Sequence, residues 1–310
     1  MERENITIAN ENKLQAATYS EPLTAFTVGW SDYTPAKLLE FIAPSIPVGR
    51  RFEFKRADNA EAFYSESDDL RAIGSEFKRV VYHGESVNEK TLNKGLTIRV
   101  DHDEVADDNW QERYTQILLQ RLLRNELRRA VSALQTIAKI DEDAVLWSDE
   151  SASNPDADIR ALLSEAADES GIRPNKILFG EDAWNFRMSC LEGQSSSVAF
   201  RASSLSPEEL GKKFMLDGCE VVSARYQATS TTKAKIASDK VFAFCAFDGV
   251  SKDEPSNLKR FYTPTQDGTP FRVYCDEHAK YTDITVEHYS SIIAASDLGV
   301  RAMSVKNSAD

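Results

Sequence analysis

The chain has 310 residues, 41% of them hydrophobic and 28% charged, which is typical of a globular protein with one large core or two modest ones. Its 50 acidic and 37 basic residues give a net charge of −13, which argues against a protein whose main task is to grip nucleic acid. The absence of a long apolar run and of a signal-peptide pattern predicts a protein kept in the cytoplasm, and four widely spaced cysteines without a CxxC pair predict free thiols.

The first part of the chain reads as an arm followed by a short helix. Residues 1–33 are polar and show no sustained period, so we expect an extended arm with little core of its own. Thr34 as a cap and Pro35 at the first helical position predict a helix, which Pro44 should end.

Residues 49–100 show a pattern of strands and loops. Phe52 and Phe54 alternate with charged residues, which predicts a half-buried strand, and strand-like runs return at 77–83 and 96–100. Long polar stretches separate these runs, which favours a projecting hairpin over a compact sheet. Such a hairpin can bury little of its surface on its own molecule and needs a neighbour.

The clearest element is a long helix. No Gly or Pro occurs between residues 96 and 154, and Asp107 or Asp108 can cap a helix that reaches Lys139, roughly 50 Å in length. Its leucines share one broad face, so the helix should pack on one side. Four arginines lie on the opposite face: Arg113, Arg121, Arg124 and Arg128. They can touch nucleic-acid phosphates or pair with acidic surfaces of neighbouring subunits, and in so acidic a protein we favour the second interpretation.

Glu126 is the exception on the apolar face of this helix. A buried carboxylate needs a partner, which Arg129 at i+3 or an arginine from another segment can provide. A slight rotation of the helix that lets Glu126 reach solvent is the alternative, and both interpretations stay open at this point.

The remaining chain alternates helices and strands after an acidic linker at 141–156. Residues 194–202 are rich in serine and read as a mobile loop. The expected helices cover 156–170, 181–188 and a segment that starts at the cap Ser206; the expected strands cover 176–179, 219–224, 241–247 and parts of 281–305. The fold class is therefore α+β.

Motifs of known catalytic or metal sites are missing from the sequence, including GxGxxG after a strand, the Walker loop, HExxH and GxSxG. Asp101 and Asp103 can chelate a hard cation, but carboxylates are ordinary at the start of a helix, where they favour its dipole. Cys275 and His278 offer half a zinc site without a second half. We therefore predict no catalytic residue, no metal and no cofactor.

The order of these elements resembles the major capsid proteins of tailed bacteriophages, and more particularly those of Mu-like phages. These proteins share the Hong Kong 97 (HK97)-like phage capsid fold. The stretches that carry the resemblance are 38–47 (LLEFIAPSIP), 49–56 (GRRFEFKR), 70–80 (LRAIGSEFKRV), 117–130 (ILLQRLLRNELRRA), 175–184 (NKILFGEDAW), 216–226 (LDGCEVVSARY) and 286–305.

The resemblance implies a division of the chain into four parts. Residues 1–33 would be an N-terminal arm that clasps neighbours, and residues 49–98 an extended loop that lies over an adjacent subunit. Residues 34–48, 99–150 and 275–310 would form a peripheral domain, with the long helix as its spine. Residues 151–274 would form an axial domain around five-fold and six-fold centres.

The resemblance also implies a structural protein and not an enzyme. Copies would self-assemble as pentamers and hexamers into an icosahedral shell around phage double-stranded DNA, which they would contact without sequence specificity. Because only about 35 residues precede the fold, a separate scaffolding protein is expected, along with a portal and, in some members of the family, decoration proteins. The shell would assemble in the bacterial cytoplasm and end in the virion, with no membrane involved.

Two other functions remain open at this point. An encapsulin-type compartment would have the same fold and enclose a protein cargo. A metal-dependent hydrolase, from a different class, would use Asp101, Asp103 or His278, and it predicts a bound stoichiometric metal.

Overall fold

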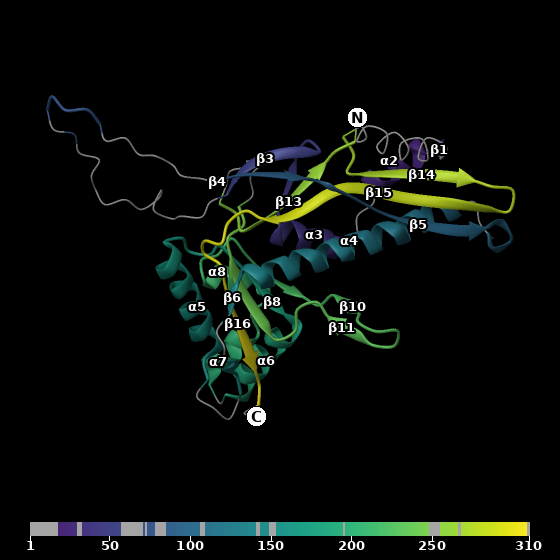
Figure 1. Ribbon diagram of the computed structural model, residues 1–310. Coiled ribbons are helices and arrows are strands. Elements are labelled where there is room, and N and C mark those ends of the chain that lie inside the picture. The colour runs from purple at the N-terminus through teal and green to yellow at the C-terminus, as the bar shows by residue number, and fades with distance from the viewer. Residues whose placement is uncertain are drawn as a thin grey trace.

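The computed structural model describes residues 18–29, 33–56, 71, 73–77, 85–105, 109–140, 143–148, 153–194, 196–247, 255–265 and 268–308. These residues form two sheets on either side of one long helix, α4 (Trp110–Ile137). Figure 1 shows α4 below a set of long strands, with the second sheet and its helices in the lower part of the view.

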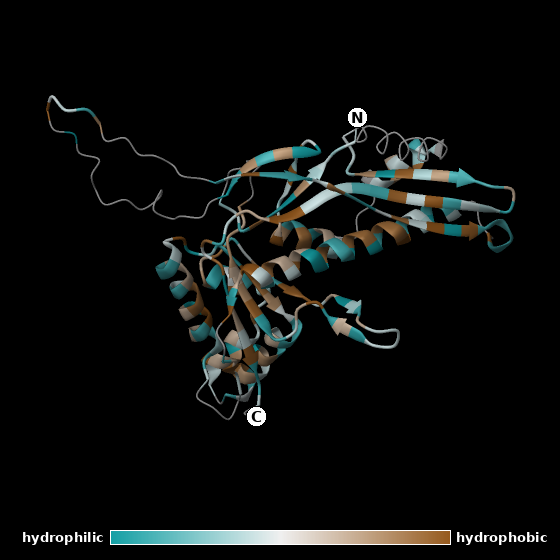
Figure 2. Cartoon of the chain, viewed as in Figure 1, coloured by the Kyte–Doolittle hydropathy of each residue, from teal (hydrophilic) through white to brown (hydrophobic). Residues whose placement is uncertain are grey.

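The first sheet has six strands in the order β1–β14–β15–β13–β2, and β5 pairs with β15. Its strands are β1 (Thr18–Tyr19), β2 (Ser45–Pro47), β5 (Leu92–Asp101), β13 (Leu258–Thr263), β14 (Phe271–Glu277) and β15 (Tyr281–Ala294). Hydrophobic and hydrophilic residues alternate along β14 and β15 (Figure 2). The apolar set, which includes Val273, Ile284 and Val286, is buried in one core with the leucines of α4. Period-two strands and a period-3.6 helix therefore meet along their apolar faces.

The N-terminal part contains one element that the sequence analysis missed. An extended arm was expected up to residue 33, but α2 (Glu21–Gly29) is a helix that packs on α4 and β14. Leu23 and Thr24 are buried there, and the Thr24 hydroxyl accepts a hydrogen bond from the Val273 amide at 3.2 Å. A nine-residue helix with buried threonines shows no clear apolar period, so tertiary packing decides its structure. The expected helix that follows is confirmed as α3 (Tyr33–Ile42).

The expected hairpin has a different second strand from the one predicted. The strand at Phe52 and Phe54 is confirmed as β3 (Arg51–Arg56), with both rings buried against Phe261 at centroid distances of 4.5 and 5.4 Å. Its partner is β4 (Glu85–Lys90). None of the side chains of β4 is buried, so its sequence is polar and resembles that of a linker. The run at 77–83 lies almost entirely outside the described residues.

The second sheet is covered on both faces. Its order is β6–β16–β12–β8–β9, and β7 pairs with β16. Its strands are β6 (Lys139–Ile140), β7 (Val145–Leu146), β8 (Lys176–Gly180), β9 (Gly218–Val222), β12 (Lys240–Phe244) and β16 (Arg301–Lys306). Phe242 and Phe244 lie on one face of the sheet, in the same core as the leucines of α4. Phe179 and Val241 lie on the other face, where they pack against helices. Two covered faces explain the continuous apolar runs that predicted these strands.

The second sheet and four helices form what we call the second unit, and the first sheet with α2, α3 and α4 forms the first. The four helices are α5 (Pro155–Ser170), α6 (Glu181–Gly193), α7 (Ser197–Ser203) and α8 (Pro207–Lys213). The expected helix at 156–170 is confirmed as α5, which Gly171 ends in the left-handed conformation with φ of 73°. The expected cap Ser206 is also confirmed, and it forms a capping box with Glu209. The predicted mobile loop at 194–202 is wrong, because α7 forms there. The Ser196 hydroxyl caps it by accepting a hydrogen bond from the Val198 amide at 3.3 Å.

Two further features bear on the site. A second hairpin, β10 (Arg225–Gln227) paired with β11 (Lys233–Lys235), projects beside α4 (Figure 1) and was not expected. The chain also crosses between the units late in its course: β13 lies in the first sheet, although it falls within residues 151–274, and the last strand β16 lies in the second sheet.

Candidate assembly interface

The four arginines singled out in the sequence all lie on the outer face of α4. Arg113, Arg121, Arg124 and Arg128 are exposed, whereas the leucines of the helix are buried. Between Arg113 and the end of the helix the only acidic residue is Glu126, which is buried. The exposed face of α4 is therefore cationic over most of its length, in a chain of net charge −13.

The four arginines differ in how far their own chain fixes them. The guanidinium of Arg128 lies 3.8 Å from the ring centroid of Tyr226 on β10, and that of Arg113 lies 5.5 Å from the Tyr114 ring. Arg121 and Arg124 form no ion pair within the residues that the structure describes. The stacking on Tyr226 covers one face of the Arg128 guanidinium and leaves its N–H edge for a carboxylate or phosphate.

Glu126 lies at the centre of a buried polar cluster. The Lys94 Nζ and Arg129 Nη1 atoms donate hydrogen bonds to Glu126 Oε1 at 2.8 and 2.7 Å, and the Ser290 hydroxyl donates to Oε2 at 2.9 Å. The Arg260 guanidinium lies 3.7 Å from Oε2. The i+3 arginine considered in the sequence thus contacts Glu126, but the other partners come from β5, β13 and β15. Sequence spacing holds no signal for those, because they lie far along the chain.

The charges in this cluster are shifted by burial and by one another. Burial alone would raise the pKa of Glu126, but the adjacent His288 ring and Lys94 ammonium outweigh it and hold the pKa well below the usual range. Burial lowers the pKa of His288, whose Nε2 is 3.8 Å from Glu126 Oε1, too far for a hydrogen bond. Burial also lowers the pKa of Lys94. The cluster ties α4 to three strands of the first sheet through a carboxylate that stays ionised.

A second buried ion pair stabilises the other unit. Arg187 on α6 is fully buried and donates to Asp156 Oδ1 at 2.9 Å, and Lys213 donates to Asp156 Oδ2 at 2.7 Å. The opposing charges lower the pKa of Asp156 although burial, the largest influence, would raise it. Arg187 shares the buried face of α6 with Ala183 and Cys190, at spacings of four and three residues. This spacing was the available signal for its burial, and the sequence analysis did not use it.

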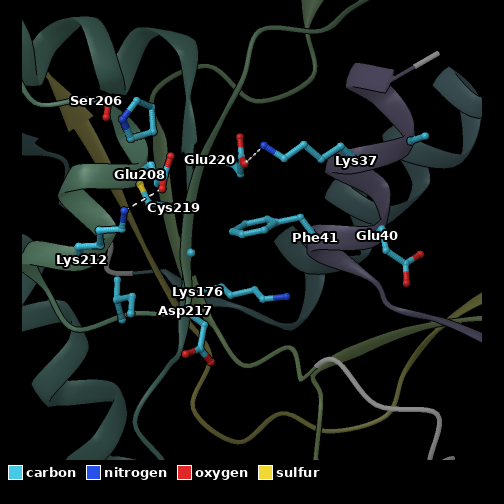
Figure 3. A pocket seen from close by; sticks show the side chains of 14 residues that line it. Lys37, Glu40, Phe41, Lys176, Ser206, Glu208, Lys212, Asp217, Cys219 and Glu220 are labelled. Carbon is cyan, nitrogen blue, oxygen red and sulfur yellow. Dashed lines mark hydrogen bonds and ion pairs between the residues drawn. The ribbon is translucent and has the colours of Figure 1, made fainter. Parts of the chain in front are cut away.

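A cleft of about 870 Å3 lies between α3 and the α8–β9 segment (Figure 3). Lys37 of α3 reaches across it to Glu220 of β9, with 2.5 Å between Nζ and Oε1. Phe41 lies against Gly218, where an added Cβ would come within 2.6 Å of the ring. Figure 3 shows acidic and basic side chains on both walls, without a cluster of one sign. The cleft is therefore a boundary between the two units, which one ion pair and one ring contact bridge.

The two constellations weighed as metal sites have structural partners instead. Asp101 Oδ1 accepts a hydrogen bond from the Asp103 amide at 3.0 Å and so caps the short turn η2 (His102–Glu104). His278 lies 3.3 Å from Asp276 and 4.5 Å from the Tyr281 ring, and Cys275 is half-buried on β14. Across the described ranges, no group of three His, Cys, Asp or Glu side chains is arranged to hold a metal ion. None of the described helices is both long enough and apolar enough to span a membrane.

Comparison with known proteins gives a likeness in structure and not in sequence. No family model and no curated protein matches the chain. A phage-related protein from Bordetella bronchiseptica matches over 93% of this chain and 97% of its own, with a TM-score of 0.67 and 17% identity. The capsid structure of cyanophage P-SCSP1u matches over 87% of this chain and 88% of its own, with a TM-score of 0.51 and 10% identity. A structure from Microbacterium phage Oxtober96 covers 87% and 90%, with a TM-score of 0.50 and 10% identity. The chain thus has the predicted α+β, Hong Kong 97-type capsid fold.

Proposed function

We propose that the chain is the major capsid protein of a tailed bacteriophage, a structural subunit without a catalytic step. Copies assemble as pentamers and hexamers into an icosahedral shell around double-stranded DNA. The observation that carries this proposal is the likeness of the fold to that of a cyanophage capsid structure, which extends over 87% of the chain. It is supported by the β3–β4 hairpin, which projects from the molecule on a small base of buried phenylalanines and offers its polar strands to a neighbour.

The proposed division of the chain into domains follows the fold, and several bounds differ from those expected from sequence. We assign the arm to the residues before β1, the extended loop to residues 49–91, and the peripheral domain to α2, α3, α4 and the first sheet, which includes β5. The axial domain is built on the second sheet, so we move β13 and β14 to the peripheral domain and β6, β7 and β16 to the axial domain. Connections that cross between the sheets three times make the two domains parts of one folding unit.

The proposed partners follow from this role. Further copies of the chain provide the main contacts, and a separate scaffolding protein, a portal and decoration proteins complete the particle. The enclosed DNA is contacted without sequence specificity. Assembly takes place in the bacterial cytoplasm, and the shell ends in the virion. Membership of the Mu-like branch is part of the proposal and is supported by the stretches of sequence named above.

Electron microscopy of negatively stained protein tests this function, with the chain expressed alone and together with its scaffolding partner. We expect closed shells, or rings of five and six subunits. A variant that lacks residues 58–75 serves as the matched control, because the deletion leaves both sheets intact. It should remain a soluble, folded subunit that no longer closes shells. A homogeneous monomer or dimer of the unaltered chain under both conditions would contradict the proposal.

The contents of the shells separate a capsid from a compartment for protein. Particles isolated from the native host and treated with nuclease should retain double-stranded DNA of uniform length. Particles that instead hold one protein species and no DNA would support the encapsulin-type alternative, and they would leave the shell function in place.

A further inference from the structure

Strand β5 runs along one margin of the first sheet, and among the described residues it pairs only with β15 (Figure 1). The pairing continues without a bulge from Leu92 to Asp101, so the other side of the strand presents a regular row of backbone N–H and C=O groups. The opposite margin of the sheet is protected, because β1 pairs with β14 and α2 packs on β14. β5 is therefore an open edge strand of ten residues.

The charged side chains of β5 do not protect this edge. Proteins usually block an open edge with an outward lysine, a proline or a bulge. The Lys94 ammonium instead donates to the buried Glu126 at 2.8 Å, and the Arg99 guanidinium donates two hydrogen bonds of 2.8 Å to Asp283 on β15. Residues 92–101 contain no proline. Both positive charges are thus held by the subunit's own carboxylates, and the edge stays open to another strand.

Apolar side chains along this edge are only partly covered. Leu96 and Ile98 pack against the core of α4 but remain half-buried, and Leu92 leaves 49% of its surface open. Leu96 and Ile98 lie on the face of the sheet that carries α4, opposite the buried Val286 and Ile284. A further strand beside β5 would cover these side chains and pair the open backbone groups at the same time.

The sequence of β5 is complementary to itself in an antiparallel register. A two-fold axis that passes through Thr97 perpendicular to the sheet puts Leu96 of each copy opposite Ile98 of the other, on the α4 face. The two Thr97 residues then lie opposite each other, and Asn93 lies opposite Asp101. No like charges face one another in this register.

Other arrangements of two β5 strands match less well. An axis through Leu96 would put Ile98 opposite Lys94, and an axis through Ile98 would leave Asn93 and Lys94 beyond the end of the partner strand. A parallel pair of the same edges would turn one α4 helix to the other side of the joined sheet. Subunits of a shell all face its interior in the same way, which favours the antiparallel pair.

We propose that the β5 edges of two copies pair antiparallel about a two-fold axis at Thr97 and join their first sheets into one. The place of this contact in a particle rests on the proposed shell function. Subunits within a ring of five or six meet through two different surfaces, whereas a two-fold contact uses the same surface twice. The β5 pair therefore links one pentamer or hexamer to the next.

A disulfide across the axis tests the pairing in the full chain. Directly opposite residues of antiparallel strands have Cα atoms about 4.5–5.5 Å apart, a distance that a disulfide spans. After oxidation, Thr97→Cys should give mostly covalent dimer on a non-reducing gel, both in particles and in concentrated unassembled protein. The absence of this dimer from both preparations would overturn the proposal.

Thr285→Cys is the matched control for this experiment. Thr285 lies directly opposite Thr97 within the subunit, and the two hydroxyl oxygens are 2.8 Å apart. It belongs to β15, which has strands on both sides, so a second copy cannot pair with it. The control should give no more dimer than the unaltered chain, whose cysteines are buried or half-buried. As much dimer from Thr285→Cys as from Thr97→Cys would also overturn the proposal.

Charges at the apolar pair test the register. Added to Thr97→Cys, the changes Leu96→Glu and Ile98→Glu set carboxylates opposite one another and should reduce the dimer about tenfold or more. Leu96→Glu with Ile98→Lys sets each glutamate opposite a lysine and should restore the dimer. Equal yields from these two variants, each folded by circular dichroism, would overturn the register. Thr97→Cys alone decides the pairing if a charged variant does not fold.

The pairing and the shell function give separate results. Covalent Thr97→Cys dimers without any shells would support the pairing and refute the shell function. Closed shells whose Thr97→Cys chains form no dimer would refute the pairing alone.

Discussion

The two faces of α4 differ in whether their charged side chains are buried and paired or exposed to solvent. On the inner face a single carboxylate, Glu126, is fully buried and is surrounded by groups of its own chain. On the outer face the arginines are exposed, and Arg121 and Arg124 have no ion-pair partner among the described residues. The charge on the inner face is thus paired within the subunit, whereas the charges of Arg121 and Arg124 on the outer face stay exposed.

The inner face of α4 contributes to the stability of the subunit, and the outer face contributes little to it. A buried charge that lost its partners would be strongly destabilising, so the Glu126 cluster fixes the position of α4 on the sheet. An exposed arginine adds little to the stability of the subunit, because water already solvates it. Substitutions on the inner face should therefore lower subunit stability strongly, and substitutions on the outer face should change it by no more than about 1 kcal/mol.

Removal of the buried carboxylate should produce the largest effect on stability. Glu126→Leu leaves the Lys94 ammonium and Arg260 guanidinium without their counter-charge, at side-chain exposures of 14% and 12%. We expect a loss of about 3–5 kcal/mol in the free energy of unfolding of the unassembled subunit, measured by urea denaturation. Arg124→Leu is the control on the other face and should stay within about 0.5 kcal/mol. Equal losses in the two variants would show that the faces do not differ.

A cavity on the inner face should have the next largest effect. Leu127 is fully buried, so Leu127→Ala should lower the free energy of unfolding by about 3 kcal/mol, through lost burial and the cavity left behind. Ile117→Ala removes a similar side chain from the outer face and should lower it by less than about 1 kcal/mol. The same urea titration measures both. A larger loss for Ile117→Ala would place the core on the wrong side of the helix.

Acid should weaken the inner face in a defined direction. The folded-state pKa of His288 is lowered, so its contribution is complete above the unfolded value of about 6.5 and is lost as pH falls below it. The pKa of Glu126 is also lowered, and its contribution is lost as pH falls below about 4.3.

Thermal unfolding of the unassembled subunit between pH 8 and pH 4 should therefore show a constant melting temperature at the alkaline end and a decline that begins near pH 6.5. His288→Gln should flatten the upper part of the decline. A melting temperature that rises on acidification would contradict the assignment of both groups.

The smallest effect should come from the stacked arginine of the outer face. Arg128 lies on the Tyr226 ring at 3.8 Å, and an exposed contact of this kind contributes about 0.5–1 kcal/mol. A double-mutant cycle of Arg128→Ala and Tyr226→Ala should give a coupling energy in that range. A coupling energy of zero would mean that the Tyr226 ring does not hold the Arg128 side chain in place.

The sequence predicted those elements whose pattern is local. The apolar stripe of α4, the helix cap at Ser206 and the alternation at Phe52 and Phe54 each need only a few neighbouring residues. Elements held by distant partners were missed: α2 depends on β14, and β4 depends on β3. The same holds for the site, because spacing identified the four arginines and Glu126, but not the stacking of Arg128 on Tyr226 or the contacts of Glu126 with Lys94 and Ser290.

Electron cryomicroscopy of the assembled particle tests the central claim most directly. If the chain is a capsid subunit, the reconstruction will show an icosahedral lattice of pentamers and hexamers. The second sheet will lie near the symmetry axes, and the β3–β4 hairpin will lie against the adjacent subunit. Particles without that lattice, or a closed ring in which the hairpin touches no neighbour, would contradict the account.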